Sequence, residues 1–246
     1  LFFLDTIIKD GLVSINLNLN FDDTGKIKKN YKIEGSVKKA KLNILNKIKL
    51  DNLNFNFDID KSIYLLKGID TKLNNIKVTS PLIEIKNKKN SFFGNGQLLN
   101  NKKNFDIDEF KPIFANLFNN VDLRVIEFSS INDFSFNINK NLKFNNLKIE
   151  SVINVNQLIF SEKNLNLKSY FPIFVEEIKL EEHKIFVNYN QNKFDIKGNG
   201  NILLEDKVDN LSYQIIKNND NLSFISKINL KNNPLLIDFL DYEKKE

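Results

Sequence analysis

The chain has 246 residues, which is long enough for one large β domain or two smaller ones. A hydrophobic fraction of 41%, with 22 Phe, can supply a core and excludes a disordered chain. The formal net charge of +5 could suggest an anionic partner. However, Arg124 is the sole arginine and Lys is interleaved with Asp and Glu, which argues against nucleic-acid binding. The abundance of Asn, Lys, Ile and Phe is typical of an AT-rich genome, so we do not interpret the basic balance as a ligand signal.

The N-terminal half begins with a predicted helix over about residues 2–9, which Gly11 ends. A strand follows in which Val13, Ile15, Leu17, Leu19 and Phe21 alternate with polar residues. The turn signal of residues 22–25 ends this strand, and the same alternation returns over residues 53–59. A second helix is predicted over residues 108–119, capped by Asp108 and with one apolar face.

The second half repeats the alternating pattern over residues 134–138, 165–167 and 222–230. A third helix is predicted over residues 234–242, because Pro234 suits a first helical position and the apolar residues after it share one helical face. The sequence therefore predicts a mainly β fold: a long antiparallel meander that forms a curved, twisted sheet or open β groove, with three short helices. We expect one continuous β-rich region over residues 1–246, with possible sub-repeats at 1–105 and 106–232.

Catalytic and metal-binding patterns are weak in this sequence. His183 is the sole histidine, and its position between Glu182 and Lys184 is typical of a solvated turn. The short glycine motifs at 94–96 and 198–200 lack the lysine and the strand-to-helix context of a phosphate-binding loop, and are interpreted as bulges or turns. The chain contains no Cys, so it has neither a disulfide framework nor a thiolate metal site. We expect no enzyme activity, no cofactor and no metal.

No segment approaches the roughly 20 consecutive apolar residues that a membrane-spanning helix needs, and the first ten residues do not form a signal peptide. The chain begins without Met and ends within a charged run, so we expect it to be a fragment of a longer protein.

Three segments carry a resemblance to a known family: residues 8–17, residues 35–42, and residues 74–78 followed by 81–85. Their strand rhythm and glycine placement resemble the AsmA-like superfamily of bacterial lipid-transfer proteins (AsmA/TamB/YhdP type). The resemblance implies a periplasmic β groove in a Gram-negative bacterium, anchored to the inner membrane through a region outside this fragment. It further implies transfer of phospholipid toward the outer membrane, and therefore a role in outer-membrane biogenesis. It implies no catalytic residues.

The apolar sides of the strands are the one candidate binding site, for phospholipid or another acyl-chain lipid. One alternative is a structural or adhesive β-sandwich or solenoid, in which the same residues are sealed inside. An outer-membrane barrel is disfavoured because the six Tyr form no girdles and Trp is absent. The predicted groove-lining residues are Ile15, Leu17, Leu19, Phe21, Leu53, Phe55, Phe57, Ile59, Phe134, Phe136, Ile138, Phe144, Leu165, Leu167 and Phe224.

Overall fold

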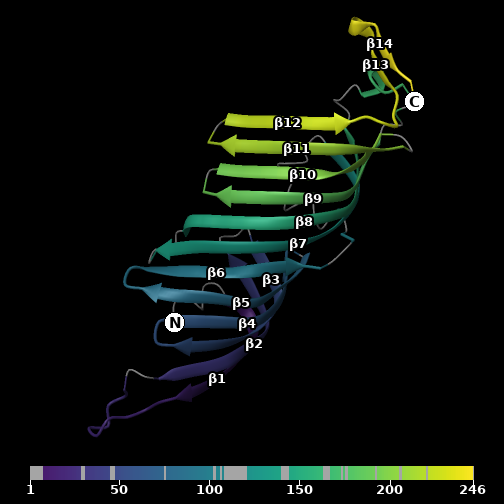
Figure 1. Ribbon diagram of the computed structural model, residues 1–246. Coiled ribbons are helices and arrows are strands. Elements are labelled where there is room, and N and C mark those ends of the chain that lie inside the picture. Colours follow the sequence, from purple (N-terminus) through teal and green to yellow (C-terminus); the bar gives the residue numbers. More distant parts are fainter. Residues whose placement is uncertain are drawn as a thin grey trace. The chain divides into compact units, whose positions relative to one another are not determined.

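The protein is a long antiparallel β meander (Figure 1). The computed structural model describes residues 8–28, 31–44, 48–74, 76–101, 104, 105, 107, 121–139, 144–162, 167–172, 174, 177–191, 193–204, 207–219 and 221–245. Within these residues, twelve strands form one sheet in which each strand is hydrogen-bonded to its neighbours in sequence. These strands are β1 (Ile8–Asn18), β2 (Lys32–Ile44), β3 (Ile48–Asp60), β4 (Ile63–Leu73), β5 (Ile76–Lys88), β6 (Ser91–Asn100), β7 (Val121–Asn139), β8 (Phe144–Glu162), β9 (Ile178–Asn190), β10 (Lys193–Leu203), β11 (Val208–Asn218) and β12 (Asn221–Asn229).

The predicted open meander is confirmed, because the sheet does not close and β1 and β12 are its two edges. Ile, Phe, Val and Thr favour extended backbone, and their alternation with polar residues gives each strand one apolar side. The residue at the start of a tight connection often has a left-handed backbone, as Lys61 does with φ 51° between β3 and β4. The predicted turn at residues 22–25 is also present, since the Gly25 amide donates to the Asp22 carbonyl at 2.9 Å.

The helix predictions are wrong where the structure describes them. Residues 234–242 contain strand β13 (Leu235–Ile237), a single 3₁₀ turn η2 (Asp238–Leu240) and the first residue of strand β14 (Tyr242–Lys244). At the N-terminal segment, residues 2–7 lie outside the described residues, while residues 8 and 9 belong to β1 rather than to a helix. The predicted helix at 108–119 lies outside the described residues.

The chain divides into two compact units. Unit 1 contains residues Leu1–Asn100 and Ile131–Ile149, and unit 2 contains Asn101–Ser130 and Glu150–Glu246. The long strands β7 and β8 contribute residues to both units. The predicted sub-repeats stay a prediction.

The core of unit 1 forms between neighbouring strands of the same sheet. Its buried members are Val37, Ala40, Leu53, Phe57 and Ile69. The half-buried hydrophobic side chains that pack against them also come from β2, β3, β4 and β5. Within the described residues, this cluster is therefore built by side-to-side packing on one face.

The core of unit 2 draws on connections as well as on strands. Phe171 and Phe174 follow the 3₁₀ turn η1 (Leu167–Ser169), and they pack with Ile178, Leu180, Ile202 and Leu204. Leu230 and Leu235 pack against this cluster, and the Leu236 amide donates to the Tyr170 carbonyl at 2.9 Å. The segment after β12 is therefore docked on the core of unit 2.

Candidate functional site

The strand register brings apolar residues that are distant in sequence into continuous rows on one face of unit 1. Residues directly opposite one another in an antiparallel pair project to the same side, so the face can be followed from strand to strand. We call the two rows together the unit 1 apolar face. From β1 to β6, one row is Ile15, Gly35, Phe57, Leu66, Ile83 and Gly96, and the next is Leu17, Ile33, Ile59, Tyr64, Ile85 and Gly94.

Glycines in these rows make room for aromatic rings from the next strand. A Cβ atom at Gly35 would overlap the ring of Phe57, and one at Gly94 would overlap the ring of Phe136. A Cβ atom at Gly96 would lie 3.0 Å from the ring of Phe134, so both β7 rings lie on the unit 1 apolar face. The interpretation of residues 94–96 as a bulge or turn is therefore wrong, since they pair in regular register inside β6.

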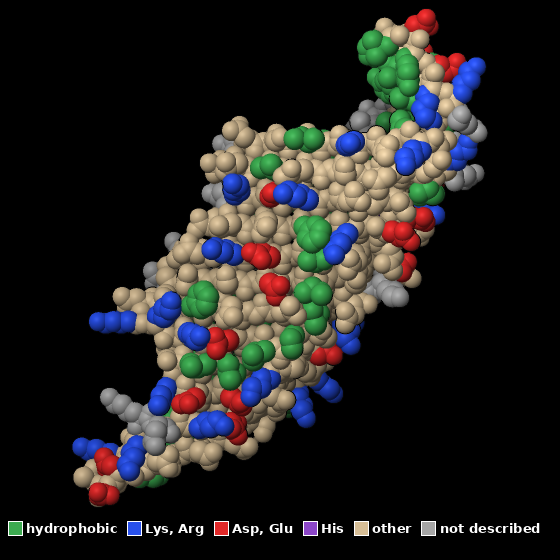
Figure 2. Space-filling view, in the orientation of Figure 1, with side chains coloured by type: hydrophobic (Ala, Val, Ile, Leu, Met, Phe, Trp, Pro, Cys, Tyr) green, Lys and Arg blue, Asp and Glu red, His purple; other side chains and the backbone are tan. Residues whose placement is uncertain are grey.

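The opposite face of unit 1 is mainly polar, with some hydrophobic side chains from β4 and β5, and it carries paired charges. Glu34 and Asp58 lie opposite each other on β2 and β3, and the Lys67 ammonium is paired with Asp58. On β5, Lys86 Nζ lies 2.8 Å from Glu84. On the face of the molecule that Figure 2 shows, Lys and Arg side chains lie close to Asp and Glu side chains rather than in a separate basic patch. The positive net charge therefore does not mark a binding surface on that face.

A similar apolar face crosses β9 to β12 in unit 2. Its central row is Val187, Ile196, Ile215 and Phe224, and we call this row, together with Tyr189, Phe194 and Leu222, the unit 2 apolar face. Further along the same side of β10, Ile202 belongs to the buried core. The core thus covers one end of this side of the sheet, while Phe224 on β12 is 61% exposed.

The predicted groove-lining residues divide into exposed and buried positions. Ile15 and Leu17 on β1 are 60% and 52% exposed, and Phe21, which bridges to Ile27 beyond β1, is also exposed. In contrast, Leu53 and Phe57 on β3 are buried in the core of unit 1. Half-buried positions complete the described set: Leu19, Phe55, Ile59, Phe134, Phe136, Ile138 and Leu167.

One predicted residue differs from its expected strand position, and the side chains of two others lie outside the described part of the chain. Leu167 lies in the 3₁₀ turn η1 and packs against the core of unit 2, so its assignment to a strand is wrong. Leu165 lies outside the described residues. Phe144 begins β8, but its side chain is outside the described part of the chain. The sequence prediction omitted Tyr64, Ile83 and Ile85, whose places in the rows depend on register.

His183 is buried inside β9, so the predicted solvated turn is wrong. Its side chain is 1% exposed, and its Nε2–H donates to the Asn201 carbonyl at 2.9 Å. Glu182 has a left-handed backbone with φ 53°, and the register between β9 and β10 shifts at this point, opposite Gly200. This irregularity directs the His183 imidazole inward, where it packs over Gly200. Burial lowers the pKa of His183, although the hydrogen bond to Asn201 opposes this effect. Burial also raises the pKa of neighbouring Tyr213 to about 12, so its hydroxyl stays protonated.

We expect the free energy of unfolding to fall as the pH is lowered from about 7.5 to 5.5. The folded state holds His183 neutral, whereas the unfolded chain takes up a proton near pH 6.5, so acidification favours unfolding by at most about 1.4 kcal/mol per pH unit. Urea unfolding followed by circular dichroism at both pH values measures the change. His183→Phe should remove this part of the pH dependence, and an unchanged slope in that variant would contradict the prediction.

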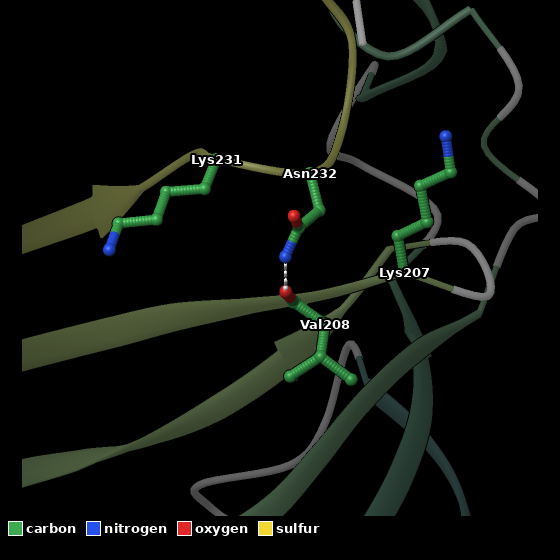
Figure 3. A pocket seen from close by; sticks show the side chains of 4 residues that line it. All are labelled: Lys207, Val208, Lys231 and Asn232. Atoms are coloured by element: carbon green, nitrogen blue, oxygen red, sulfur yellow. Dashed lines mark hydrogen bonds between the residues drawn. The ribbon is translucent and has the colours of Figure 1, made fainter.

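Among the described residues, the other polar side chains do not form a metal-binding cluster or a paired cationic site. No group of three or more His, Cys, Asp and Glu side chains there could hold a metal ion. A pocket in unit 2 is lined by Lys207, Val208, Lys231 and Asn232, and the Asn232 side-chain amide donates to the Val208 carbonyl at 2.6 Å (Figure 3). The two lysine side chains extend in different directions rather than converging on one point. This pocket therefore does not present a paired cationic site.

Comparison with known proteins gives no relative: the chain matches no family model, no curated protein and no solved structure. Within the described residues, no helix has the length and apolar character needed to cross a membrane. The two apolar faces are therefore the candidate functional site on the basis of their geometry.

Proposed function

We propose that the protein binds the acyl chains of lipids along its apolar sheet faces. The observation that carries this proposal is the exposure of hydrophobic side chains at the ends of continuous apolar rows. Ile15 and Leu17 expose more than half of their surface at one edge of the sheet, and Phe224 does so at the other. Exposed apolar residues that lie in register are typical of a surface that contacts another apolar molecule.

The dimensions of the unit 1 apolar face suit a lipid chain. Neighbouring strands lie about 4.8 Å apart, so the five spacings from β1 to β6 span about 24 Å. One leaflet of a bilayer has a hydrocarbon depth of about 15 Å, half of the roughly 30 Å core. An acyl chain could therefore lie across the strands along one row.

Burial of an acyl chain on this face is energetically useful without specific polar contacts. Each methylene removed from water contributes about 0.8 kcal/mol, so a chain of about sixteen carbons gains roughly 12 kcal/mol before entropic costs. A surface of this kind needs neither a catalytic cluster nor a conserved polar motif. The polar opposite face, with its Lys and carboxylate pairs, would remain in water.

The proposed setting comes from the resemblance to the AsmA-like superfamily. In this setting the protein lies in the periplasm, is held at the inner membrane by a region outside this chain, and passes phospholipid toward the outer membrane. The apolar faces would then hold the acyl chains during transfer while the headgroups stay hydrated.

Photo-crosslinking from paired positions on β1 tests the proposal. A benzophenone amino acid at Leu17 projects from the unit 1 apolar face, whereas the same probe at Asn18 projects from the opposite face of the same exposed strand. With vesicles of phosphatidylethanolamine and phosphatidylglycerol that contain a radiolabelled phospholipid, we expect several-fold more labelled adduct from position 17 than from position 18.

A second pair of positions extends the test to other strands. Phe224 represents the unit 2 apolar face, and exposed Asn56 on β3 represents the polar face of unit 1. The probe at position 224 should give about as much labelled adduct as the probe at position 17. The probe at position 56 should give about as little as the probe at position 18. Equal labelling at all four positions would contradict lipid binding and favour a structural or adhesive β module.

A further inference from the structure

The edge strand β12 is exposed along its whole length. All nine residues from Asn221 to Asn229 are exposed, and β11 is their only strand partner in the described sheet. The β11–β12 pairing has no register shift, so β12 presents a regular row of backbone groups at its free side. An unpaired regular edge of this kind can accept another strand.

The other edge strand is irregular in comparison. β1 pairs with β2 through two register shifts, and Gly11, with φ 136°, lies within the second of them, between Asp10 and Leu12. The Asp10 side chain accepts a hydrogen bond from the Gly11 amide, which occupies that backbone donor. Bulges and locally satisfied backbone groups are the features that protect a sheet edge from further pairing. β12 has neither a bulge nor a proline, and Lys227 is its single charged residue.

Hydrophobic side chains are exposed on both sides of β12. Leu222, Phe224 and Ile228 project from one side, and Ile225, which is 62% exposed, projects from the other. An apolar ligand on one face would cover the first group but would leave Ile225 in water. A strand added at the edge would instead cover side chains on both sides.

We propose that β12 pairs antiparallel with β12 of a second copy of this chain, around a two-fold axis at Ile225. The sequence of the strand is complementary to itself in this register: Ile225 lies opposite its own counterpart, Leu222 lies opposite Ile228, and Phe224 lies opposite Ser226. The only charged residue, Lys227, lies opposite Ser223, so no like charges meet across the axis.

Other registers fit less well. A two-fold axis between two residues would join the apolar side of one copy to the polar side of the other, because a one-residue slip exchanges the two faces of a strand. An axis at Phe224 or at Ser226 keeps the faces matched but leaves residues at one end of β12 unpaired. The axis at Ile225 pairs all nine residues and continues the unit 2 apolar face into the second copy.

Cysteine crosslinking tests both the pairing and its register, because the natural chain contains no Cys. Directly opposed residues have Cα atoms about 4.5–5.5 Å apart, which is within the range of a disulfide. Ile225→Cys should therefore form a disulfide-linked dimer under mild oxidation. Leu222→Cys is the matched control in the same exposed strand, since two copies of position 222 would lie about 20 Å apart at roughly 3.3 Å per residue.

We expect several-fold more covalent dimer from Ile225→Cys than from Leu222→Cys, and we expect Leu222→Cys to crosslink to Ile228→Cys when the two variants are mixed. Sedimentation should show a dimer for the natural chain and a monomer for Ile225→Lys, in which two ammonium groups would meet at the axis. Ile225 is exposed, so this variant should keep the circular dichroism of the natural chain. A monomeric natural chain, or equal crosslinking at positions 222 and 225, would overturn the proposal. Neither measurement depends on lipid binding.

Discussion

Replacement of Phe57 by alanine is expected to lower the free energy of unfolding by about 3–5 kcal/mol, the usual cost of removing a buried aromatic ring. Phe57 is 9% exposed and belongs to the buried cluster that holds β2, β3 and β4 together. Its ring also covers Gly35 on β2, where no side chain could fill the space that the ring would leave. Urea unfolding followed by circular dichroism measures the loss as a lower midpoint.

Phe239→Ala is the matched control, because Phe239 in η2 is 80% exposed. Its removal should change the free energy of unfolding by no more than about 0.5 kcal/mol. Similar losses in the two variants would contradict the burial of Phe57. Phe57 is therefore expected to stabilise the sheet, whereas Leu17 on the same apolar face is 52% exposed.

The strand pattern was predictable from sequence because it is local. Alternation over residues 13–21 and 53–59 indicates extended backbone with one apolar side, whatever the partner strand is. The meander follows from the succession of such strands and turns. The openness of the sheet was left undecided by the sequence, because the same alternation occurs in sealed sandwiches and in single sheets.

The rows of the candidate site were not predictable in the same way, because they depend on register. Ile15 on β1 and Phe57 on β3 lie in the same row because both are paired with Gly35 on β2. A shift of the strand register by one residue would turn either side chain to the other face of the sheet. His183 shows the same limit, since its burial results from the bulge at Glu182 rather than from its acidic sequence neighbours. Local composition favoured a solvated turn, and strand pairing determined the outcome.

The C-terminal helix prediction failed because tertiary contacts outweighed a helical pattern. Leu235, Leu236, Phe239 and Leu240 have helical spacing, yet Ile237 pairs with Tyr242 across a tight hairpin. Leu235 packs on the core of unit 2, and the backbone of Leu236 is bonded to Tyr170. Isolated helices of this length are marginal in water, so docking of the hairpin is sufficient to determine the structure.

The attachment of this hairpin depends on Asp209, at the start of β11. Asp209 is 4% exposed, and its carboxylate accepts hydrogen bonds from the backbone amides of Lys231, Asn232 and Asn233, at 2.7, 3.0 and 3.1 Å. It also accepts one from the Asn233 side-chain amide at 2.8 Å. Burial alone would raise the pKa of Asp209, but these hydrogen bonds outweigh it and hold the pKa below its ordinary value. The carboxylate is therefore charged at neutral pH.

Asp209→Ala is expected to lower the free energy of unfolding by about 2–4 kcal/mol, because it leaves three backbone amides without their acceptor. It also removes one of the two acceptors of the Asn233 side-chain amide, which keeps its hydrogen bond to the Lys207 carbonyl. The loss should be concentrated in β13 and β14, whose amides should exchange faster with deuterium, while amides in β3 keep their protection. Asp209→Asn retains one acceptor oxygen, so its free energy of unfolding should fall by less. Asp23→Ala, in the exposed turn of residues 22–25, should leave the free energy of unfolding almost unchanged.

The contribution of Asp209 has a defined pH dependence. Because the folded pKa is lowered, this contribution is present above the unfolded value of about 3.9 and is lost as the pH falls through the folded pKa. Protection of the hairpin in the natural chain should therefore persist at pH 5. If the hairpin of Asp209→Ala remains as protected as that of the natural chain, the core contacts of Leu230 and Leu235 hold it in place without the carboxylate.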